Sequence, residues 1–107
     1  METKVSFAQK VYEVCSSIPE GKVSTYGDVA RKIGSSPRAV GQALRCNPYA
    51  PKVPCHRVVS ALGRIGGFMG ETKGVEIERK VALLKDEGVN VSDGKILDFE
   101  KVRFCWE

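Results

Sequence analysis

Two short helical segments joined by a glycine constrain the fold of this chain more than any other feature. Thr25-Tyr26-Gly27-Asp28 is a capping signature for a helix that we expect to end at Gly34. Ser35-Ser36-Pro37 predicts the start of a second helix, because a hydroxyl can cap its first turn and proline lacks the N–H that this turn leaves unbonded. Helix, short turn and helix in this order are typical of the helix-turn-helix motif.

The residues around this motif predict two further helices and little strand. Ser6-Phe7-Ala8-Gln9 is a capping box for a first helix that we expect to stop near Ser17. Apolar residues at helical spacing between 77 and 84 predict a fourth helix that ends at Gly88, and Val58-Val59 indicates a short strand.

The end of the chain predicts a small hairpin, with strands over 89–92 and 96–99 around Asp93-Gly94, and we expect Trp106 to pack against the body. Together these patterns predict a mainly α fold with short β elements, a winged-helix-like helix-turn-helix domain. We expect residues 1–107 to form this single domain, with no additional N-terminal domain.

Charge is distributed unevenly along the chain. Residues 22–64 contain eight Lys or Arg and one acidic residue, Asp28, which gives +7. The other residues contain nine basic and twelve acidic side chains, which gives −3. A basic middle segment indicates a surface that faces a polyanion, although a solvated basic face has the same composition.

The predicted helix after Pro37 has an apolar face and a basic face. Its apolar residues Val40, Ala43 and Leu44 can face the core. The opposite face carries Arg38, Gly41, Gln42 and Arg45. Arginines beside small or amide residues suit a helix that lies close to a sugar-phosphate backbone, but many amphipathic helices also expose arginine.

Pro54-Cys55-His56-Arg57-Val58 places a thiol beside the only histidine of the chain. A thiol becomes a nucleophile as the thiolate, and a neighbouring imidazole is one way to form it. A buried structural cysteine next to a surface histidine is the alternative interpretation, because buried cysteines usually act as small apolar residues.

Other classes of function are disfavoured by the sequence. One histidine and four cysteines without a CxxC pair predict no metal site, and we expect no cofactor. The glycine-rich stretch 66–70 has no preceding strand at the spacing of a phosphate-binding loop. With no membrane span and no signal peptide, we expect a cytoplasmic protein with reduced thiols.

Four features in order carry a family resemblance: the helix-turn-helix, Arg-Ala-Val-Gly, Arg-Cys-Asn-Pro and Pro-Cys-His-Arg-Val-Val. From about Phe7 to Val89 the chain resembles the DNA-binding, active-site domain of O6-alkylguanine-DNA alkyltransferases. The resemblance implies a DNA repair protein, a methylated-DNA–protein-cysteine methyltransferase. Such a protein flips O6-alkylguanine out of double-stranded DNA from the minor groove and transfers the alkyl group irreversibly to its own cysteine. We expect it to act as a monomer in the cytoplasm, associated with the nucleoid if the source is prokaryotic.

The resemblance also implies catalytic roles. Cys55 matches the alkyl acceptor, which His56 deprotonates through a water, and Glu87 matches the glutamate that ends this relay. Asn47 matches the hinge between the recognition helix and the active-site loop. Tyr26 matches the tyrosine that helps to rotate the phosphate and protonates the leaving guanine.

The remaining roles concern DNA and the flipped base. Arg38 matches the arginine finger that fills the stack vacated by the flipped nucleotide. Further DNA contacts are expected from Thr25, Gly41, Gln42 and Arg45. The base pocket is expected to contain Val58, Phe68, Met69 and Lys80.

The chain departs from the family pattern at three positions: Phe68 replaces a tyrosine, Pro37 a small residue and Cys46 a glycine. Its length and its Trp-containing end are similar to the alkyltransferase-like proteins, which bind the same lesions but lack the acceptor cysteine. A non-catalytic sensor of O6-alkylguanine is therefore an alternative, and a helix-turn-helix transcription regulator is a second.

Overall fold

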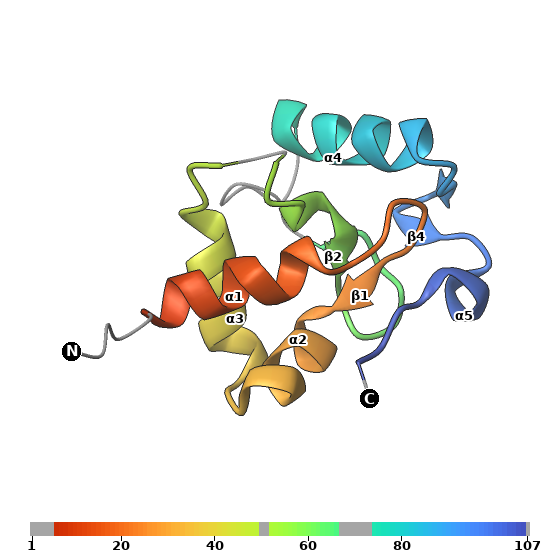
Figure 1. Cartoon of the computed structure of the whole chain (residues 1–107). Helices are drawn as coiled ribbons and strands as arrows, with labels where there is room; N and C mark the ends of the chain where they lie inside the picture. Colours follow the sequence, from red (N-terminus) through yellow and green to blue (C-terminus); the bar gives the residue numbers. More distant parts are fainter. Residues whose placement is uncertain (1–5, 50–51, 67–73, 107) are drawn as a thin grey trace.

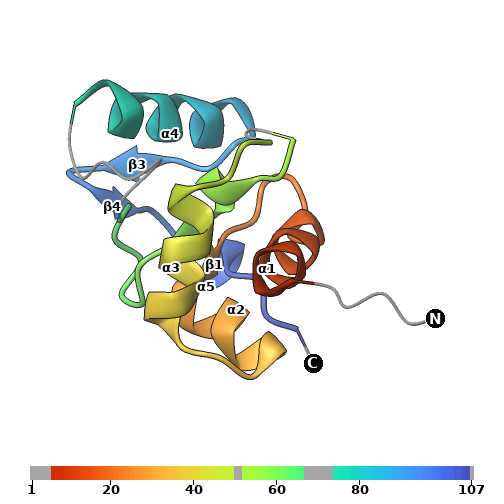
Figure 2. The same cartoon turned by 90° about the vertical axis from the view of Figure 1, so that its left-hand side faces the viewer.

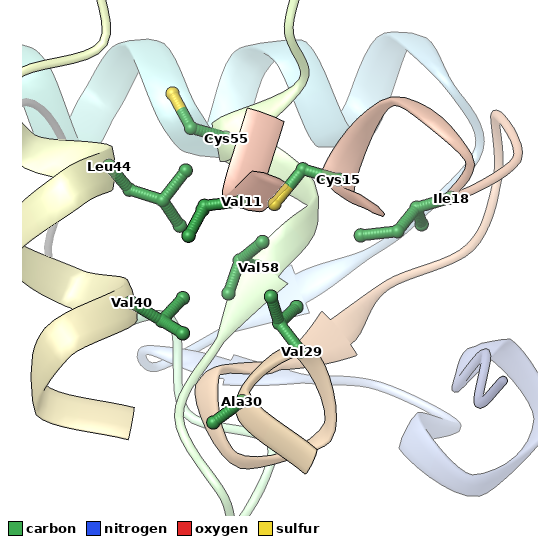
Figure 3. Packing of buried hydrophobic residues seen from close by; sticks show 9 residues of the cluster. All are labelled: Val11, Cys15, Ile18, Val29, Ala30, Val40, Leu44, Cys55 and Val58. Atoms are coloured by element: carbon green, nitrogen blue, oxygen red, sulfur yellow. The ribbon is translucent and has the colours of Figure 1, made fainter. Parts of the chain in front are cut away.

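The computed structural model of this chain describes residues 6–49, 52–66 and 74–106. Helices α1 (Phe7–Ser16), α2 (Tyr26–Ile33) and α3 (Pro37–Arg45) pack against one another (Figure 1). Ser6 and Gln9 form the predicted capping box at the start of α1. The three helices enclose the main core, whose burial of apolar surface is the principal stabilising contribution. Its buried members are Val11, Cys15, Ile18, Val29, Ala30, Val40, Leu44, Cys55 and Val58 (Figure 3).

The predicted helix-turn-helix is confirmed. The Thr25 hydroxyl accepts the N–H of Asp28 at 2.9 Å, which caps α2. Gly34 ends that helix in the left-handed conformation, with φ 70°. The Ser36 hydroxyl accepts the N–H of Ala39 at 3.2 Å and starts α3. Local side-chain chemistry therefore determines both boundaries of the turn.

Two short strands connect this motif to the Cys-His segment. Strand β1 (Ser24–Thr25) pairs in parallel with β2 (Val58–Val59), with Ser24 opposite Val58. The 3₁₀ turn η1 (Cys55–Arg57) directly precedes β2, and α2 directly follows β1. The pairing thus places the Cys-His segment near the start of α2 (Figure 1).

Helix α4 (Val75–Asp86) lies beside a hairpin of β3 (Val91–Ser92) and β4 (Lys95–Ile96) (Figure 2). The predicted turn at Asp93-Gly94 is confirmed, and both of its residues have positive φ. The strands are shorter than predicted: β3 lacks residues 89 and 90, and β4 begins one residue earlier and ends before Asp98, which adopts the left-handed conformation.

The prediction of strand at Phe99 was wrong, since this residue begins a short helix, α5 (Phe99–Val102). The prediction for the end of the chain is confirmed. The indole Nε1 of Trp106 donates to the Ser17 hydroxyl at 2.7 Å, and the ring packs edge-on against Phe104. A mainly α fold with short strands is therefore confirmed. Within the described ranges, no helix has both the length and the apolar character needed to cross a membrane.

Candidate active site

Cys55 lies where the loop after α3 turns into η1, with Pro54 before it and β2 shortly after. Its side chain is buried, with 4% of the residue exposed. Figure 3 shows the Cys55 sulfur pointing away from the apolar cluster, whereas the Cys15 sulfur points into it. The two buried thiols therefore have different surroundings, although both belong to the main core.

Burial raises the pKa of the Cys55 thiol above its ordinary value. A hydrogen bond from Asn47 and the positive charge of Lys80 act in the opposite direction without cancelling this effect. The resting form at neutral pH is therefore the thiol. Proximity to His56 in the sequence does not by itself produce a thiolate, so nucleophilic attack requires a group that accepts the proton.

His56 is hydrogen-bonded to the carboxylate of Glu87. Its Nε2 lies 2.9 Å from Oε2 of Glu87, the residue that follows α4. Arg57 donates to the same carboxylate from Nε at 2.8 Å and from Nη2 at 2.6 Å. A third bond, from Arg57 Nη1 to the carbonyl of Ile18 at 2.8 Å, joins this network to the end of α1. The four residues connect three separate parts of the chain.

This geometry determines which nitrogen of His56 can accept a proton. Burial raises the pKa of Glu87, but the hydrogen bonds from Arg57 and His56 outweigh it and hold that pKa below its usual value. An ionised carboxylate only accepts, so Nε2 carries the hydrogen and Nδ1 carries the lone pair. Nδ1 is buried and has no hydrogen-bond partner among the described residues. Burial also lowers the pKa of His56, against the pull of Glu87, which favours the neutral ring that a general base needs.

Asn47 shapes the loop that carries Cys55. Its side chain is buried, with Nδ2 donating to the carbonyl of Val53 at 3.1 Å and Oδ1 accepting the N–H of Tyr49 at 2.9 Å. The side-chain amide of Asn47 thus links the end of α3 to Val53, which lies just before Pro54. Asn47, which was predicted to be a hinge, therefore lies between α3 and Cys55 and bonds to the loop that joins them.

Lys80 and Tyr26 are close enough to Cys55 to interact with it electrostatically. The ammonium Nζ of Lys80, which is fully buried, donates to the carbonyl of Val58 at 2.7 Å and lies 6.0 Å from the centre of the Tyr26 ring. Burial lowers the pKa of Lys80 to about 7. Burial raises the pKa of Tyr26 to about 12, with smaller contributions from Cys55 and Cys15, so this phenol is a weaker acid than an ordinary tyrosine.

The predicted DNA-facing residues of α3 are on the surface. Arg38, Gln42 and Arg45 are exposed, and a Cβ added at Gly41 would meet only open space. Thr25 differs, because it is 2% exposed and its hydroxyl is used to cap α2. A DNA contact from Thr25 stays a prediction, and its capping bond accounts for its side chain.

The predicted base pocket is described only in part. Phe68 and Met69 lie outside the described residues. The Val58 side chain is fully buried in the core cluster (Figure 3). Its carbonyl oxygen accepts the hydrogen bond from Lys80.

Sequence reasoning did not assign a role to Arg57, although its position beside His56 in the motif was a usable signal. Its bidentate contact with Glu87 depends on a separation of 30 residues that no local pattern reveals. No cluster of His, Cys, Asp and Glu that could hold a metal ion occurs in the part of the chain that the structure describes.

Comparison with known proteins gives one consistent family. Residues 6–89 match the sequence profile of the family described as 6-O-methylguanine DNA methyltransferase, DNA binding domain. The methylated-DNA–protein-cysteine methyltransferase of Methanothermobacter thermautotrophicus is 41% identical over 85 residues, which cover 79% of this chain and 46% of that protein. The chain therefore spans about half the length of the curated relatives that it matches.

Two solved structures have folds similar to that of this chain. Mycobacterium tuberculosis OGT in complex with DNA has a TM-score of 0.68 at 41% identity, over 79% of this chain and 51% of that chain. S. pombe Atl1, in complex with damaged DNA containing O6-carboxymethylguanine, has a TM-score of 0.77 at 32% identity, over 99% of both chains.

Proposed function

Because the chain belongs to the 6-O-methylguanine DNA methyltransferase family, we propose that it removes the alkyl group of O6-alkylguanine in double-stranded DNA by transferring it to Cys55. The observation that carries this proposal is the hydrogen bonding of His56, the residue that follows Cys55 in the chain. The Glu87 carboxylate accepts a hydrogen bond from Nε2–H of His56, so Nδ1, which carries the lone pair, is the ring nitrogen that can accept a proton. This is the arrangement that a buried thiol with a raised pKa requires.

The transfer balances with groups of this chain alone. The Cys55 sulfur attacks the alkyl carbon, so an S–C bond forms while the bond from that carbon to guanine O6 breaks. The thiol proton passes through a water to Nδ1 of His56, and the imidazolium is stabilised by Glu87. The leaving guanine takes a proton from the Tyr26 phenol, which is protonated at neutral pH, and the phenolate that remains is balanced by the imidazolium of His56.

The product predicts a single turnover. A thioether has no activated carbonyl that water can attack, so no step regenerates the Cys55 thiol. The protein acts once per molecule and needs no cofactor.

The alkyl group lies inside the duplex, so the nucleotide must leave the stack first, at a cost of a few kcal/mol that is smaller for a poorly paired base. The exposed basic face of α3 supports binding to the phosphates from the minor groove. Arg38 fills the space left by the flipped nucleotide. Gly41 has no side chain, and this permits close approach of α3 to the DNA backbone. We propose that the protein works as a monomer in the cytoplasm, associated with the nucleoid if its source is prokaryotic.

A direct mass measurement tests the proposal. After incubation with a duplex that contains one O6-methylguanine, the peptide that contains Cys55 should gain the mass of one methyl group. Cys46→Ser is the matched control, because this cysteine is exposed in the same loop region and should be dispensable. An unmodified Cys55 on protein that is bound to the lesion would refute alkyl transfer.

A second candidate is a sensor that binds the lesion without repairing it. It is favoured by the coverage of 99% of both chains in the comparison with S. pombe Atl1. A sensor should bind an O6-methylguanine duplex equally well as native protein and as Cys55→Ala, with no methyl transfer by the native protein. The same mass measurement therefore separates the two functions.

A further inference from the structure

The C-terminal tail, residues 99–106, is bonded to the segment that leads into the helix-turn-helix. The N–H of Val23 donates to the carbonyl of Val102 at 2.8 Å, and the N–H of Phe104 donates to the carbonyl of Val23 at 2.7 Å. Val23 and Arg103 thus form a parallel bridge, while β1, directly after Val23, pairs with β2. The segment that precedes α2 is therefore hydrogen-bonded on one side to the tail, through Val23, and on the other to β2, the strand that follows Cys55.

The tail also provides the main partner of a buried carboxylate in α2. The side chain of Asp28 is 2% exposed, and Arg103 binds it with both ends of its guanidinium, Nε to Oδ2 at 3.0 Å and Nη2 to Oδ1 at 2.9 Å. Arg31 reaches the same carboxylate at 3.4 Å, but its side chain is 79% exposed. An exposed ion pair contributes little, whereas a buried carboxylate that loses a bidentate partner is strongly disfavoured.

Packing holds the Arg103 side chain in this position. Its guanidinium carbon lies 5.6 Å from the centre of the Phe99 ring. Phe99 in turn lies against Gly63, where an added Cβ would be only 2.8 Å from the ring. The guanidinium therefore lies between the Phe99 ring and the Asp28 carboxylate, and both contacts restrict its side chain.

Asp28 links this tail contact to the start of α2. Its backbone N–H is bonded to the Thr25 hydroxyl, and Tyr26 is the first residue of the helix between them. We propose that Arg103, acting through Asp28, is a positioning residue for Tyr26, so that the C-terminal tail is part of the apparatus that engages a flipped O6-alkylguanine. This inference rests on the proposed function, in which Tyr26 acts on the phosphate and the leaving base.

The test is a double-mutant cycle in the full chain. Arg103→Met should slow methyl transfer from an O6-methylguanine duplex by about tenfold, because misplacement of a reacting group by about 1 Å can cost about 100-fold and a smaller displacement costs less. In a Tyr26→Phe background the same substitution should change the rate by less than about twofold, since a residue that acts through Tyr26 has nothing further to position. Arg103→Lys, which keeps the charge but not the bidentate geometry, should fall between native protein and Arg103→Met.

Lys101→Met is the matched control, because this residue is exposed on the same tail and should leave the rate unchanged. Losses that multiply in the double variant, or a native rate in Arg103→Met, would overturn the inference. If Arg103→Met does not fold, Arg103→Lys in both backgrounds gives the same comparison. If native protein transfers no methyl group, the proposed function fails, and the cycle is measured instead as affinity for the lesion duplex, which still supports or refutes the role of Arg103.

Discussion

Replacing Glu87 by glutamine changes the charge beside His56 with little change in shape. The carboxylate accepts from His56 Nε2 at 2.9 Å and from Arg57 Nε and Nη2 at 2.8 and 2.6 Å. An amide accepts through its oxygen only, so in either orientation its NH₂ group faces one of these donors. Glu87→Gln therefore removes at least one charge-assisted hydrogen bond and the negative charge that favours an imidazolium at position 56.

The size of the effect follows from the value of such a bond. A hydrogen bond to a charged group contributes about 1.5–3 kcal/mol, and each 1.4 kcal/mol in a barrier is about tenfold in rate. The second-order rate constant for methyl transfer from an O6-methylguanine duplex should therefore fall by about 10- to 100-fold in Glu87→Gln. Quench-flow mixing followed by mass analysis of the Cys55 peptide measures this constant.

Two further variants show whether the loss is catalytic. Glu78→Gln changes an exposed carboxylate of α4 and should be indistinguishable from native protein. Arg57→Lys weakens the bidentate contact with Glu87 but leaves the bond from His56 in place, so it should lower stability more than rate. A rate constant in folded Glu87→Gln equal to that of native protein would refute the assignment of His56 as the base.

Three other outcomes are expected. The folded-state pKa of Lys80, lowered to about 7 by burial, means that the unfolded chain binds more protons above that pH. From pH about 7 to 8.5 this group should make the free energy of unfolding rise by up to about 1.4 kcal/mol per pH unit, and urea titrations of Lys80→Met should show a flatter profile. Arg38→Ala should slow repair of a duplex more than reaction with a free alkylated base, because only the duplex requires extrusion, and equal losses in the two assays would contradict this role. Gly63→Ala should lower the free energy of unfolding by about 1–3 kcal/mol, because φ is +78° and the new Cβ would meet the Phe99 ring; an unchanged urea midpoint would argue against that contact.

The helices were predictable because their boundaries are set by residues next to one another in the sequence. The caps at Thr25 and Ser36 and the left-handed Gly34 each act within a few positions. The helix α5 carries no comparable signal: it has four residues, and no side chain caps its start. Its position follows from hydrogen bonds between the tail and Val23, which a pattern read along the chain does not contain.

The residues of the candidate site could be predicted from the sequence, but the protonation state of Cys55 could not. The resemblance to a family brought His56 and Glu87 together across a separation of 31 residues, which spacing alone cannot do. The resting form of Cys55 depends on its burial against the charge of Lys80, and both are products of tertiary packing. A cysteine next to a histidine in sequence therefore indicated a reactive pair without indicating that the thiol keeps its proton.

The network around His56 has a structural role that does not depend on chemistry at Cys55. Arg57 joins the Glu87 carboxylate to the carbonyl of Ile18, and so ties the end of α4 to the end of α1. A lesion sensor built on this fold needs the same bonds to hold its pocket, so the bonds alone do not separate transfer from sensing. The transfer that we propose, unlike sensing, requires a thiol at position 55 and a ring nitrogen that can accept its proton. The Cys55 sulfur points away from the apolar cluster (Figure 3), and Nδ1 of His56, the next residue in the chain, has no hydrogen-bond partner among the described residues.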